Sequence, residues 1–303
     1  MITGLFHSSY TISDAESTVC FCRDVLKLEN TRWQVSDQPY LESVTGFPRC
    51  SLRIGFAQAE GDDISYEMVE YVKPKGQRAK TGFGIPGSMY MCWEVDNLDA
   101  AISRLKAANV PVIAEPGVVD AGLWQGARGV FFLDPDGILT ELVEIQYLPG
   151  GSGRFLRLHH TTFTVTCIDA ALQIFCGKLG LVTGLIAHSP GSYFQNFAQL
   201  ADASMEKAYL SVPNTNHKIE FLEYSTPSGP AAAMISNNLG SGHLCFQVDN
   251  IHATYSELRA IGIEFVGKPT EITAGLNKGG FATYFKGVDS IRFELFQKPG
   301  QAV

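Results

Sequence analysis

Four residues in the second half of this 303-residue chain are of types that bind divalent metal ions: His160, Glu220, His243 and Glu294. Each lies in a segment where apolar and polar residues alternate, the pattern of a half-buried β-strand. A buried carboxylate is costly unless it is paired, and two carboxylates that face one interior repel each other. A divalent cation removes both costs, and imidazole with carboxylate suits Fe(II), Mn, Ni, Co or Zn. We therefore predict that these four residues are metal ligands.

Alternation along a strand also indicates which side chains share a cavity. In GHLCFQV, at 242–248, the leucine, phenylalanine and valine form one apolar face, and His243 and Gln247 lie on the other. On the last strand Glu294 shares a face with Arg292. We expect His243 and Glu294 to point into one cavity from neighbouring strands, with Gln247 beside them as a candidate contact for the substrate.

Two further side chains are candidates for binding a substrate. Arg292 would hold a carboxylate, phosphate or thioester carbonyl inside the cavity, or would instead pair with an acidic neighbour at its rim. Tyr193 lies in the loop AHSPGSYFQN, which would line the mouth of the cavity.

The sequence repeats itself after 153 residues: Glu67 aligns with Glu220, and SRLKA in the first half with SELRA in the second. The same shift aligns the two halves over nearly the whole chain, which indicates a tandem duplication. We expect two domains, at 1–149 and 155–303, joined by the glycine-rich LPGGSG at 148–153.

Each half divides again into two modules, in which a strand precedes a helix and about three more strands. GLFHSSYTI at 4–12 and GSMYMCWEV at 87–95 have strand patterns, and each is followed by apolar residues at helical spacing. We expect an α+β fold in which four βαβββ modules form two tandem, cup-shaped open barrels with the helices outside.

Several of these segments resemble the vicinal-oxygen-chelate superfamily, which includes glyoxalase I, methylmalonyl-CoA epimerase, bleomycin and fosfomycin resistance proteins and type I extradiol dioxygenases. They are HHTTFTV, GHLCFQVDNI and RFELFQKP in the second half, and WEVDNLDAAISRLKAANV and FFLDPDGILTELVE in the first. The resemblance covers nearly the whole chain. It implies paired modules, with a divalent metal ion held on the first and last strands of each. The second half then offers the four ligands predicted above. The first half offers His7, Glu67, Tyr90 and Glu141, where a phenol replaces a histidine, and we expect a degenerate site there.

The pairing of the modules decides which residues complete the metal site. Sequential neighbours usually pack together, so we expect pairing within each half. Pairing across the halves would instead complete His243 and Glu294 with His7 and Glu67. Either arrangement leaves one complete site that contains His243 and Glu294.

The resemblance also implies a substrate with two vicinal oxygens and a cation that stabilises an enediolate. We expect a glyoxalase- or epimerase-like lyase or isomerase that transfers a proton, with Glu220 and Glu294 as catalytic carboxylates. Tyr284 is a further catalytic candidate or a core aromatic residue, since Phe131 stands at the matching position. The alternative reaction is catechol cleavage by an Fe(II) extradiol dioxygenase, but the stretch 265–283 lacks the histidine of that signature. A third possibility, a non-catalytic resistance-type binding protein, fits poorly with an intact ligand set.

The composition excludes several other classes of protein. The net charge is -8 and no basic stripe is visible, which argues against nucleic-acid binding. The chain begins without a basic and apolar leader, and no apolar run approaches the ~18 residues that span a bilayer. The seven cysteines include no C-x-x-C, which favours buried thiols in a reducing compartment. We expect a cytoplasmic protein that acts on a small molecule, with homo-oligomerisation left open.

Overall fold

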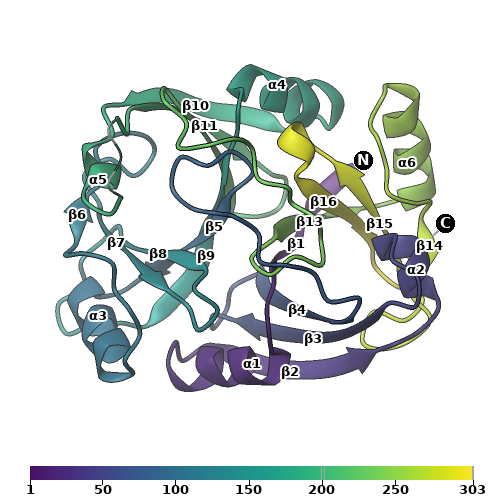
Figure 1. Cartoon of the computed structure of the whole chain (residues 1–303), viewed down its shortest axis with the longest axis horizontal. Helices are drawn as coiled ribbons and strands as arrows, with labels where there is room; N and C mark the ends of the chain where they lie inside the picture. The colour runs from purple at the N-terminus through teal and green to yellow at the C-terminus, as the bar shows by residue number, and fades with distance from the viewer. Residues whose placement is uncertain (199, 201, 302–303) are drawn as a thin grey trace.

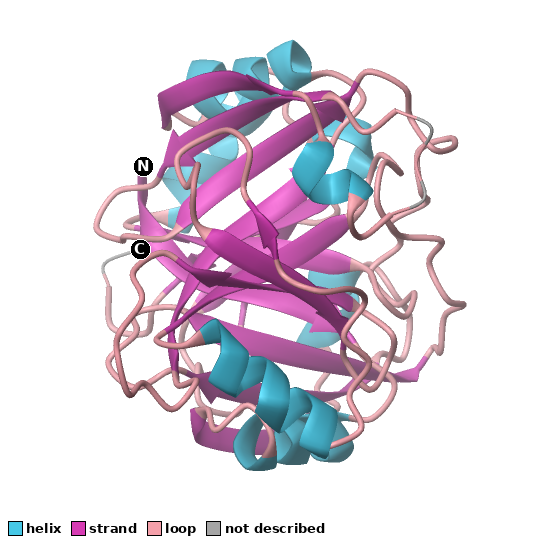
Figure 2. Cartoon of the chain, turned by 90° about the vertical axis from the view of Figure 1, so that its left-hand side faces the viewer, coloured by secondary structure: helices cyan, strands magenta, loops and turns pink. Residues whose placement is uncertain are grey.

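The computed structural model describes residues 1–198, 200 and 202–301. The chain forms two curved sheets of eight strands each, with the helices at the periphery (Figures 1 and 2). The predicted α+β fold, with two cup-shaped sheets and the helices outside, is thereby confirmed. No helix in the described part of the chain is long and apolar enough to cross a membrane.

The first sheet combines the first and the fourth module, which lie at opposite ends of the sequence. In order across the sheet, its strands are β14 (Thr270–Glu271), β15 (Phe281–Lys286), β16 (Arg292–Gln297), β13 (Gly242–Val248), β1 (Ile2–Thr11), β4 (Ser65–Lys73), β3 (Ser51–Gln58) and β2 (Glu29–Ser36). The two modules join where β1 runs antiparallel to β13, with Ser9 opposite His243. Figure 1 accordingly shows the purple start of the chain beside strands of its yellow end.

The second sheet combines the second and the third module. In order, its strands are β10 (Val182–Ser189), β11 (Met205–Ser211), β12 (Lys218–Tyr224), β9 (Phe155–Thr164), β5 (Met89–Val95), β8 (Leu139–Glu144), β7 (Arg128–Leu133) and β6 (Gly117–Val118). These modules join where β5 runs antiparallel to β9, with Tyr90 opposite Thr162. The two sheets are thus built alike.

The expected pairing of modules within each half is therefore wrong. The physical reason lies in the connections: β4 ends at Lys73 and β5 begins at Met89, which leaves enough chain to reach the other sheet. The equivalent connection in the second half crosses in the opposite direction, and the two segments bind each other. Leu239 N donates to Gln77 O at 2.8 Å, and Ala79 N donates to Leu239 O at 2.9 Å. The limits 1–149 and 155–303 remain a prediction about the sequence repeat, because each sheet draws one module from each half.

Three helices of similar length lie outside the sheets: α1 (Ala15–Asp24), α3 (Leu98–Ala107) and α6 (Ile251–Ala260). Each begins after an aspartate or asparagine whose side chain accepts a hydrogen bond from a backbone N–H three residues on, which favours the helix start. The shorter helical segments are α2 (Tyr40–Thr45), α4 (Ile168–Leu172), a π-helical stretch (Gln173–Lys178), α5 (Ser192–Gln195) and a 3-10 turn (Val288–Ser290). Helix α2 contacts β14 and β15 of the other module and so covers one side of the first cup.

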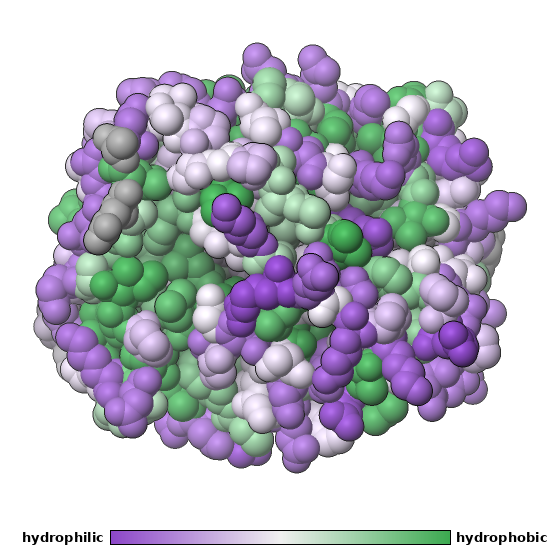
Figure 3. Space-filling model, in the orientation of Figure 1, coloured by the Kyte–Doolittle hydropathy of each residue, from purple (hydrophilic) through white to green (hydrophobic). Residues whose placement is uncertain are grey.

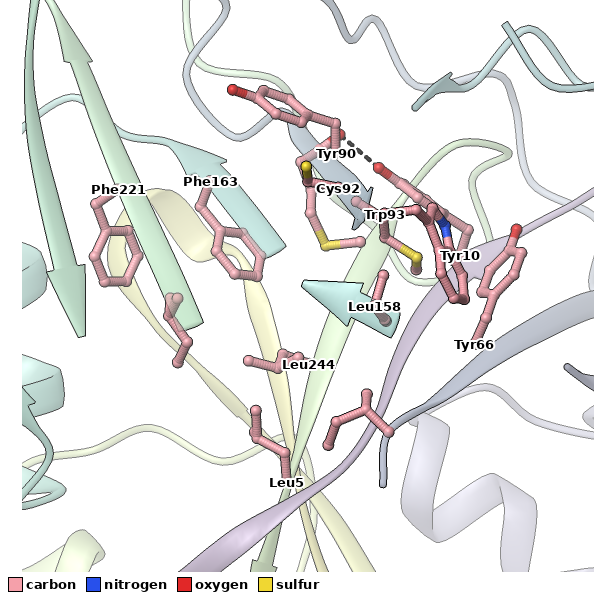
Figure 4. Packing of buried hydrophobic residues seen from close by; sticks show 14 of the residues in the cluster. Leu5, Tyr10, Tyr66, Tyr90, Cys92, Trp93, Leu158, Phe163, Phe221 and Leu244 are labelled. Carbon is pink, nitrogen blue, oxygen red and sulfur yellow. Dashed lines mark hydrogen bonds between the residues drawn. The ribbon is translucent and has the colours of Figure 1, made fainter. Parts of the chain in front are cut away.

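A continuous apolar core fills the space between the two sheets (Figure 4). Leu5 and Leu158, which are equivalent in the repeat, enter it from the central strands β1 and β9. The hydroxyls of Ser8 and Thr161, also equivalent, lie 3.0 Å apart and bind each other. The two halves thus meet at a local twofold axis, and the side chains on the opposite strand faces are left to line the cups.

One buried carboxyl makes the stability of this fold depend on pH. Asp134 follows β7, and its Oδ1 accepts hydrogen bonds from the backbone N–H groups of Asp136 at 2.9 Å and Ile138 at 2.8 Å. Burial raises the pKa of Asp134 to about 7. The folded state therefore binds this proton more tightly than the unfolded chain, and the free energy of unfolding should fall as pH rises from about 4 to about 7.

In an Asp134→Asn variant this pH-dependent part of the free energy of unfolding should vanish. The amide oxygen still accepts both backbone hydrogen bonds, but the side chain carries no charge at any pH. Urea denaturation at pH 5 and pH 7.5 measures it. We expect the wild type to lose stability relative to the variant between these pH values, by an amount on the order of a few kcal/mol. Equal losses in the two proteins would contradict the assignment to Asp134.

Candidate metal centre

The concave face of the first sheet brings together His7, Glu67, His243 and Glu294, from the central and neighbouring strands of both its modules. His7 Nε2 lies 3.2 Å from Glu67 Oε2, 3.1 Å from Glu294 Oε2 and 3.2 Å from His243 Nε2. His243 Nε2 lies 3.3 Å from Glu294 Oε2 and 3.6 Å from Glu67 Oε2. All four residues are buried. We call this group the first centre.

A local irregularity in β1 turns His7 toward the cup. Strict alternation would place Leu5 and His7 on the same face of the strand. The pairing of β1 with β13 shifts between these two residues, so that Leu5 enters the core and His7 faces the concave side. The equivalent shift in β9 lies between Leu158 and His160. The same shift in register therefore orients His7 in the first cup and His160 in the second.

The charges of the first centre suit a bound divalent cation. Burial opposes protonation of His7, but the carboxylates of Glu67 and Glu294 outweigh it and raise its pKa. Burial alone would raise the pKa of Glu294, yet His243 and His7 hold it well below its usual range. Among the described residues, no lysine or arginine pairs with either carboxylate. Two imidazoles and two carboxylates without a protein cation are a donor set that suits a divalent metal ion, and His7, His243 and Glu294 lie close enough together to share one.

A cavity of about 680 Å³, its open mouth included, adjoins the first centre. His7, Glu67, Glu294 and Tyr284 line one part of it. The hydroxyl of Tyr284 lies 3.3 Å from Nε2 of His243. Burial raises the pKa of Tyr284 well above its ordinary value, so the phenol remains protonated and is able to donate a hydrogen bond. A small molecule in this cavity would therefore meet the carboxylates and the phenol together.

The second sheet places His160, Glu220 and Glu141 at the equivalent positions, and Tyr90 takes the place of the second histidine. His160 Nε2 lies 3.5 Å from Glu141 Oε2 and 3.5 Å from Glu220 Oε2. We call this group the second centre. It also contains a possible ligand set of Cys92, His159 and His160, whose ligand atoms lie within 4.8 Å of one another.

Protein side chains already satisfy both carboxylates of the second centre. Lys207 Nζ lies 3.5 Å from Glu220 Oε1, with each side chain only 3% exposed. Thr162 Oγ1 donates to Glu220 Oε2 at 2.7 Å. Tyr193 Oη donates to Glu141 Oε1 at 2.7 Å. The lysine supplies the positive charge that the first centre lacks.

The space around His160 in the second centre is filled as well. The ring of Trp124 stacks on that of His160, with 4.3 Å between centroids and 4° between planes. His160 Nδ1 lies 3.0 Å from His159 Nδ1, so these two atoms share a hydrogen bond. An apolar cavity of about 730 Å³ that includes Tyr90 and Leu139 remains on the same sheet. Figure 3 shows a hollow with apolar side chains on the side of the molecule where Figure 1 has β7 and β8.

Two segments of the sequence, at residues 4–142 and 157–295, match one family, the Glyoxalase/Bleomycin resistance protein/Dioxygenase superfamily. The chain belongs to this superfamily. The two matches correspond to the two halves of the repeat, and the predicted resemblance is thereby confirmed.

Known members of the superfamily with detectable similarity are enzymes of several classes. Lactoylglutathione lyase of Schizosaccharomyces pombe is 28% identical over 204 residues, 63% of this chain and 60% of that protein. The chain thus spans less than two thirds of the lyase. The 2-epi-5-epi-valiolone epimerase of Actinomyces sp is 29% identical over 150 residues, 48% of this chain and 81% of that protein.

Solved structures of other members show the same fold. Glyoxalase I from Zea mays superposes with a TM-score of 0.67 at 14% identity, over 97% of this chain and 92% of that chain. A putative dioxygenase from Bacillus subtilis superposes with a TM-score of 0.65 at 15% identity, over 98% and 86%. At these identities the likeness concerns the fold alone.

Within this superfamily fold, the four ligands predicted from the second half of the sequence do not meet. His243 and Glu294 lie on the first sheet, whereas His160 and Glu220 lie on the second. The exchange of modules between the halves is the reason. It is the alternative pairing considered above that brings His7 and Glu67 to His243 and Glu294, and it makes Glu220 unavailable as a base there.

The predicted substrate contacts also lie outside the first cavity. Gln247 Nε2 donates to Leu5 O at 3.0 Å. Arg292 Nη1 donates to Thr45 O at 3.3 Å, and the side chain lines a small crevice beside His243 instead of the cavity. Tyr193 belongs to the second centre. Tyr284 is the one predicted catalytic residue besides Glu294 that lines the first cavity.

Sequence reasoning missed the residues that distinguish the two cups, although the repeat contains the signal. A shift of 153 residues aligns Lys207 with Ile54, and Trp124 with Asn277. Ile54 and Asn277 line the open first cavity, whereas their partners fill the second centre. A comparison of the two halves position by position would have identified the open cup.

Proposed function

We propose that this protein is a metal-dependent lyase or isomerase that transfers a proton at a carbon beside a carbonyl, at the first centre. The observation that carries the proposal is the fourth side chain of the centre, the carboxylate of Glu67. It faces the cavity together with Glu294, so a base stands directly beside the place of the metal ion. A base next to a Lewis acid is what proton transfer requires. The lyase and the epimerase among the relatives support this class of reaction.

The residues of the centre divide into anchors and a base. His7, His243 and Glu294 would hold the ion, with Glu67 as the fourth ligand. A divalent cation bound there stabilises the negative charge that develops on two adjacent oxygens of the substrate. Glu294 lies 3.1 Å from His7 and 3.3 Å from His243, whereas Glu67 lies 3.2 Å and 3.6 Å from the same two nitrogens and is the less tightly paired carboxylate. We therefore assign the base to Glu67.

The chemistry of the cavity then follows from these positions. A carboxylate oxygen of Glu67 takes the proton from the carbon that bears the hydroxyl and returns it to the neighbouring carbonyl carbon, while the hydroxyl proton passes to the former carbonyl oxygen. The Tyr284 phenol, held protonated by burial, donates a hydrogen bond to a substrate oxygen as charge builds up.

Metal analysis and deuterium exchange test the proposal together. After loading with Mn, Fe(II), Co, Ni or Zn, we expect about one ion per chain, and less than a tenth of that in a His243→Ala variant. We expect the loaded protein to exchange solvent deuterium into an α-hydroxy ketone. His188→Ala serves as the control, because His188 is exposed and pairs with Glu206 outside both centres.

The competing reaction has its own readout. The protein would be loaded with Fe(II) and given a catechol. Rapid oxygen uptake and a yellow ring-fission product, without deuterium exchange, would show that the reaction is extradiol cleavage and not proton transfer. Equal metal content in the wild type and His243→Ala would remove the first centre from the proposal altogether.

A further inference from the structure

The walls of the first cavity are aromatic and aliphatic. Phe6 stacks on Phe296, with 4.5 Å between ring centroids and 15° between planes. Phe56 and Ile54 contribute further apolar surface. No lysine or arginine is among the described residues that line this cavity. Arg32 on β2 has its guanidinium 5.2 Å over the ring of Phe56 and is not part of the lining.

Two side-chain amides are among the polar groups that line the cavity away from the metal centre. Gln34 lies on β2, and Asn277 lies in the connection between β14 and β15. Neither amide makes a hydrogen bond within the described part of the chain. Gly275, at φ +79°, leaves room for the glutamine, since a Cβ there would lie 3.0 Å from Gln34 Nε2. Each amide therefore has free donors and an acceptor for a ligand.

The second cup shows what closes such a cavity. Trp124 stands where the first cup has Asn277, and Lys207 stands where it has Ile54. A large ring and a cation thus fill this part of the second cup, whereas a small amide and an aliphatic side chain keep the equivalent part of the first cup open. The open cavity is therefore a property of these particular residues and not of the fold.

From this lining we infer that the first cavity takes small, uncharged aromatic compounds with an α-hydroxy-carbonyl group. The ring lies against the phenylalanines, and an uncharged polar substituent binds Gln34 or Asn277. Conjugates of large anionic carriers are excluded, because a glutathione conjugate brings carboxylates and a coenzyme A thioester brings phosphates, and both need cationic partners. The inference rests on the proposed function, because that function requires a substrate with two vicinal oxygens that the metal ion would bind.

Binding of unreactive hydroxamates to the metal-loaded protein tests the substrate class without any turnover. Isothermal titration would compare acetohydroxamate, benzohydroxamate and a hydroxamate linked to glutathione. We expect benzohydroxamate to bind at least 10-fold more tightly than acetohydroxamate, and the glutathione-linked compound no more tightly than acetohydroxamate. The inference is overturned if the glutathione-linked compound binds most tightly, or if the phenyl ring adds no affinity.

A substitution taken from the second cup sharpens this test. Asn277→Trp should weaken benzohydroxamate binding more than 10-fold and leave acetohydroxamate binding unchanged. The matched control is Leu276→Trp, at a neighbouring side chain that is 58% exposed. Equal binding of benzohydroxamate by both variants would contradict the proposed position of the ring.

The reaction is tested separately with 2-hydroxyacetophenone, whose isomerisation to 2-hydroxy-2-phenylacetaldehyde moves one proton between the adjacent carbons and one between their oxygens. If benzohydroxamate binds as expected but no deuterium exchanges into this ketone, the inferred substrate class is supported and the proposed proton transfer is contradicted. Exchange only into a glutathione hemithioacetal would support proton transfer and overturn the inferred substrate class.

Discussion

Replacing Glu67 by glutamine is expected to lower the rate of proton exchange by about 10²- to 10⁴-fold, the usual contribution of a positioned base. The amide oxygen of glutamine still offers a ligand atom in the same place, but it does not accept a proton at neutral pH. Metal content should therefore stay near that of the wild type. The measurement is deuterium exchange at saturating metal, together with metal analysis of the same sample.

The matched control for this variant is Glu220→Gln, because Glu220 occupies the equivalent position of the second centre. It should leave exchange within about a factor of 3, since an independent site lies outside the reaction. Its melting temperature should fall, because the buried ammonium of Lys207 loses its ion pair. Loss of deuterium exchange in Glu220→Gln, with full exchange in Glu67→Gln, would show that the reaction takes place in the second cup.

The alternation of side chains predicted more of this site than the order of the modules did. It correctly placed His243 and Glu294 on the cavity face of their strands, and Leu244 and Phe246 in the core. Alternation is a local property of the backbone, so the sequence contains it directly.

The partners of His243 and Glu294 could not be predicted in the same way. Pairing within a half and pairing across the halves use the same strands and bury the same faces. What distinguishes them is the path of the two connections, which cross between the sheets and bind each other at Gln77 and Leu239. Such long-range packing has no periodic signature in the sequence, and the preference for sequential neighbours was misleading here.

The shift in register before His7 is a second feature without a local signature. The pattern GLFHSSYTI reads as a regular strand, yet Leu5 and His7 lie on different faces. The histidine was predicted as a possible ligand only through the family resemblance, at the position equivalent to His160. Its orientation depends on how β1 pairs with β13, which is a tertiary contact.

The second cup should be convertible into a metal site by substitutions taken from the first. We expect the triple variant Lys207→Ile, Trp124→Asn and Tyr90→His to bind about two ions per chain, where the wild type binds about one. Removal of the lysine leaves the buried Glu220 carboxylate without its ammonium partner, which costs about 3 to 5 kcal/mol in the absence of metal. The triple variant should therefore melt at a lower temperature than the wild type when metal-free and recover on addition of the ion.

The reciprocal change, Ile54→Lys, should abolish metal binding at the first centre and with it all exchange activity. Ile54 lines the first cavity at the position that Lys207 holds in the second. A lysine there would pair with Glu67 as Lys207 pairs with Glu220, and it would supply internally the charge that the ion otherwise brings. Two ions per chain in the wild type, or full metal content in Ile54→Lys, would show that the buried lysine does not decide which cup takes the metal. One ion in the wild type, two in the triple variant and none in Ile54→Lys would instead show that a single buried charge, placed differently in two copies of one fold, separates a metal centre from its filled counterpart.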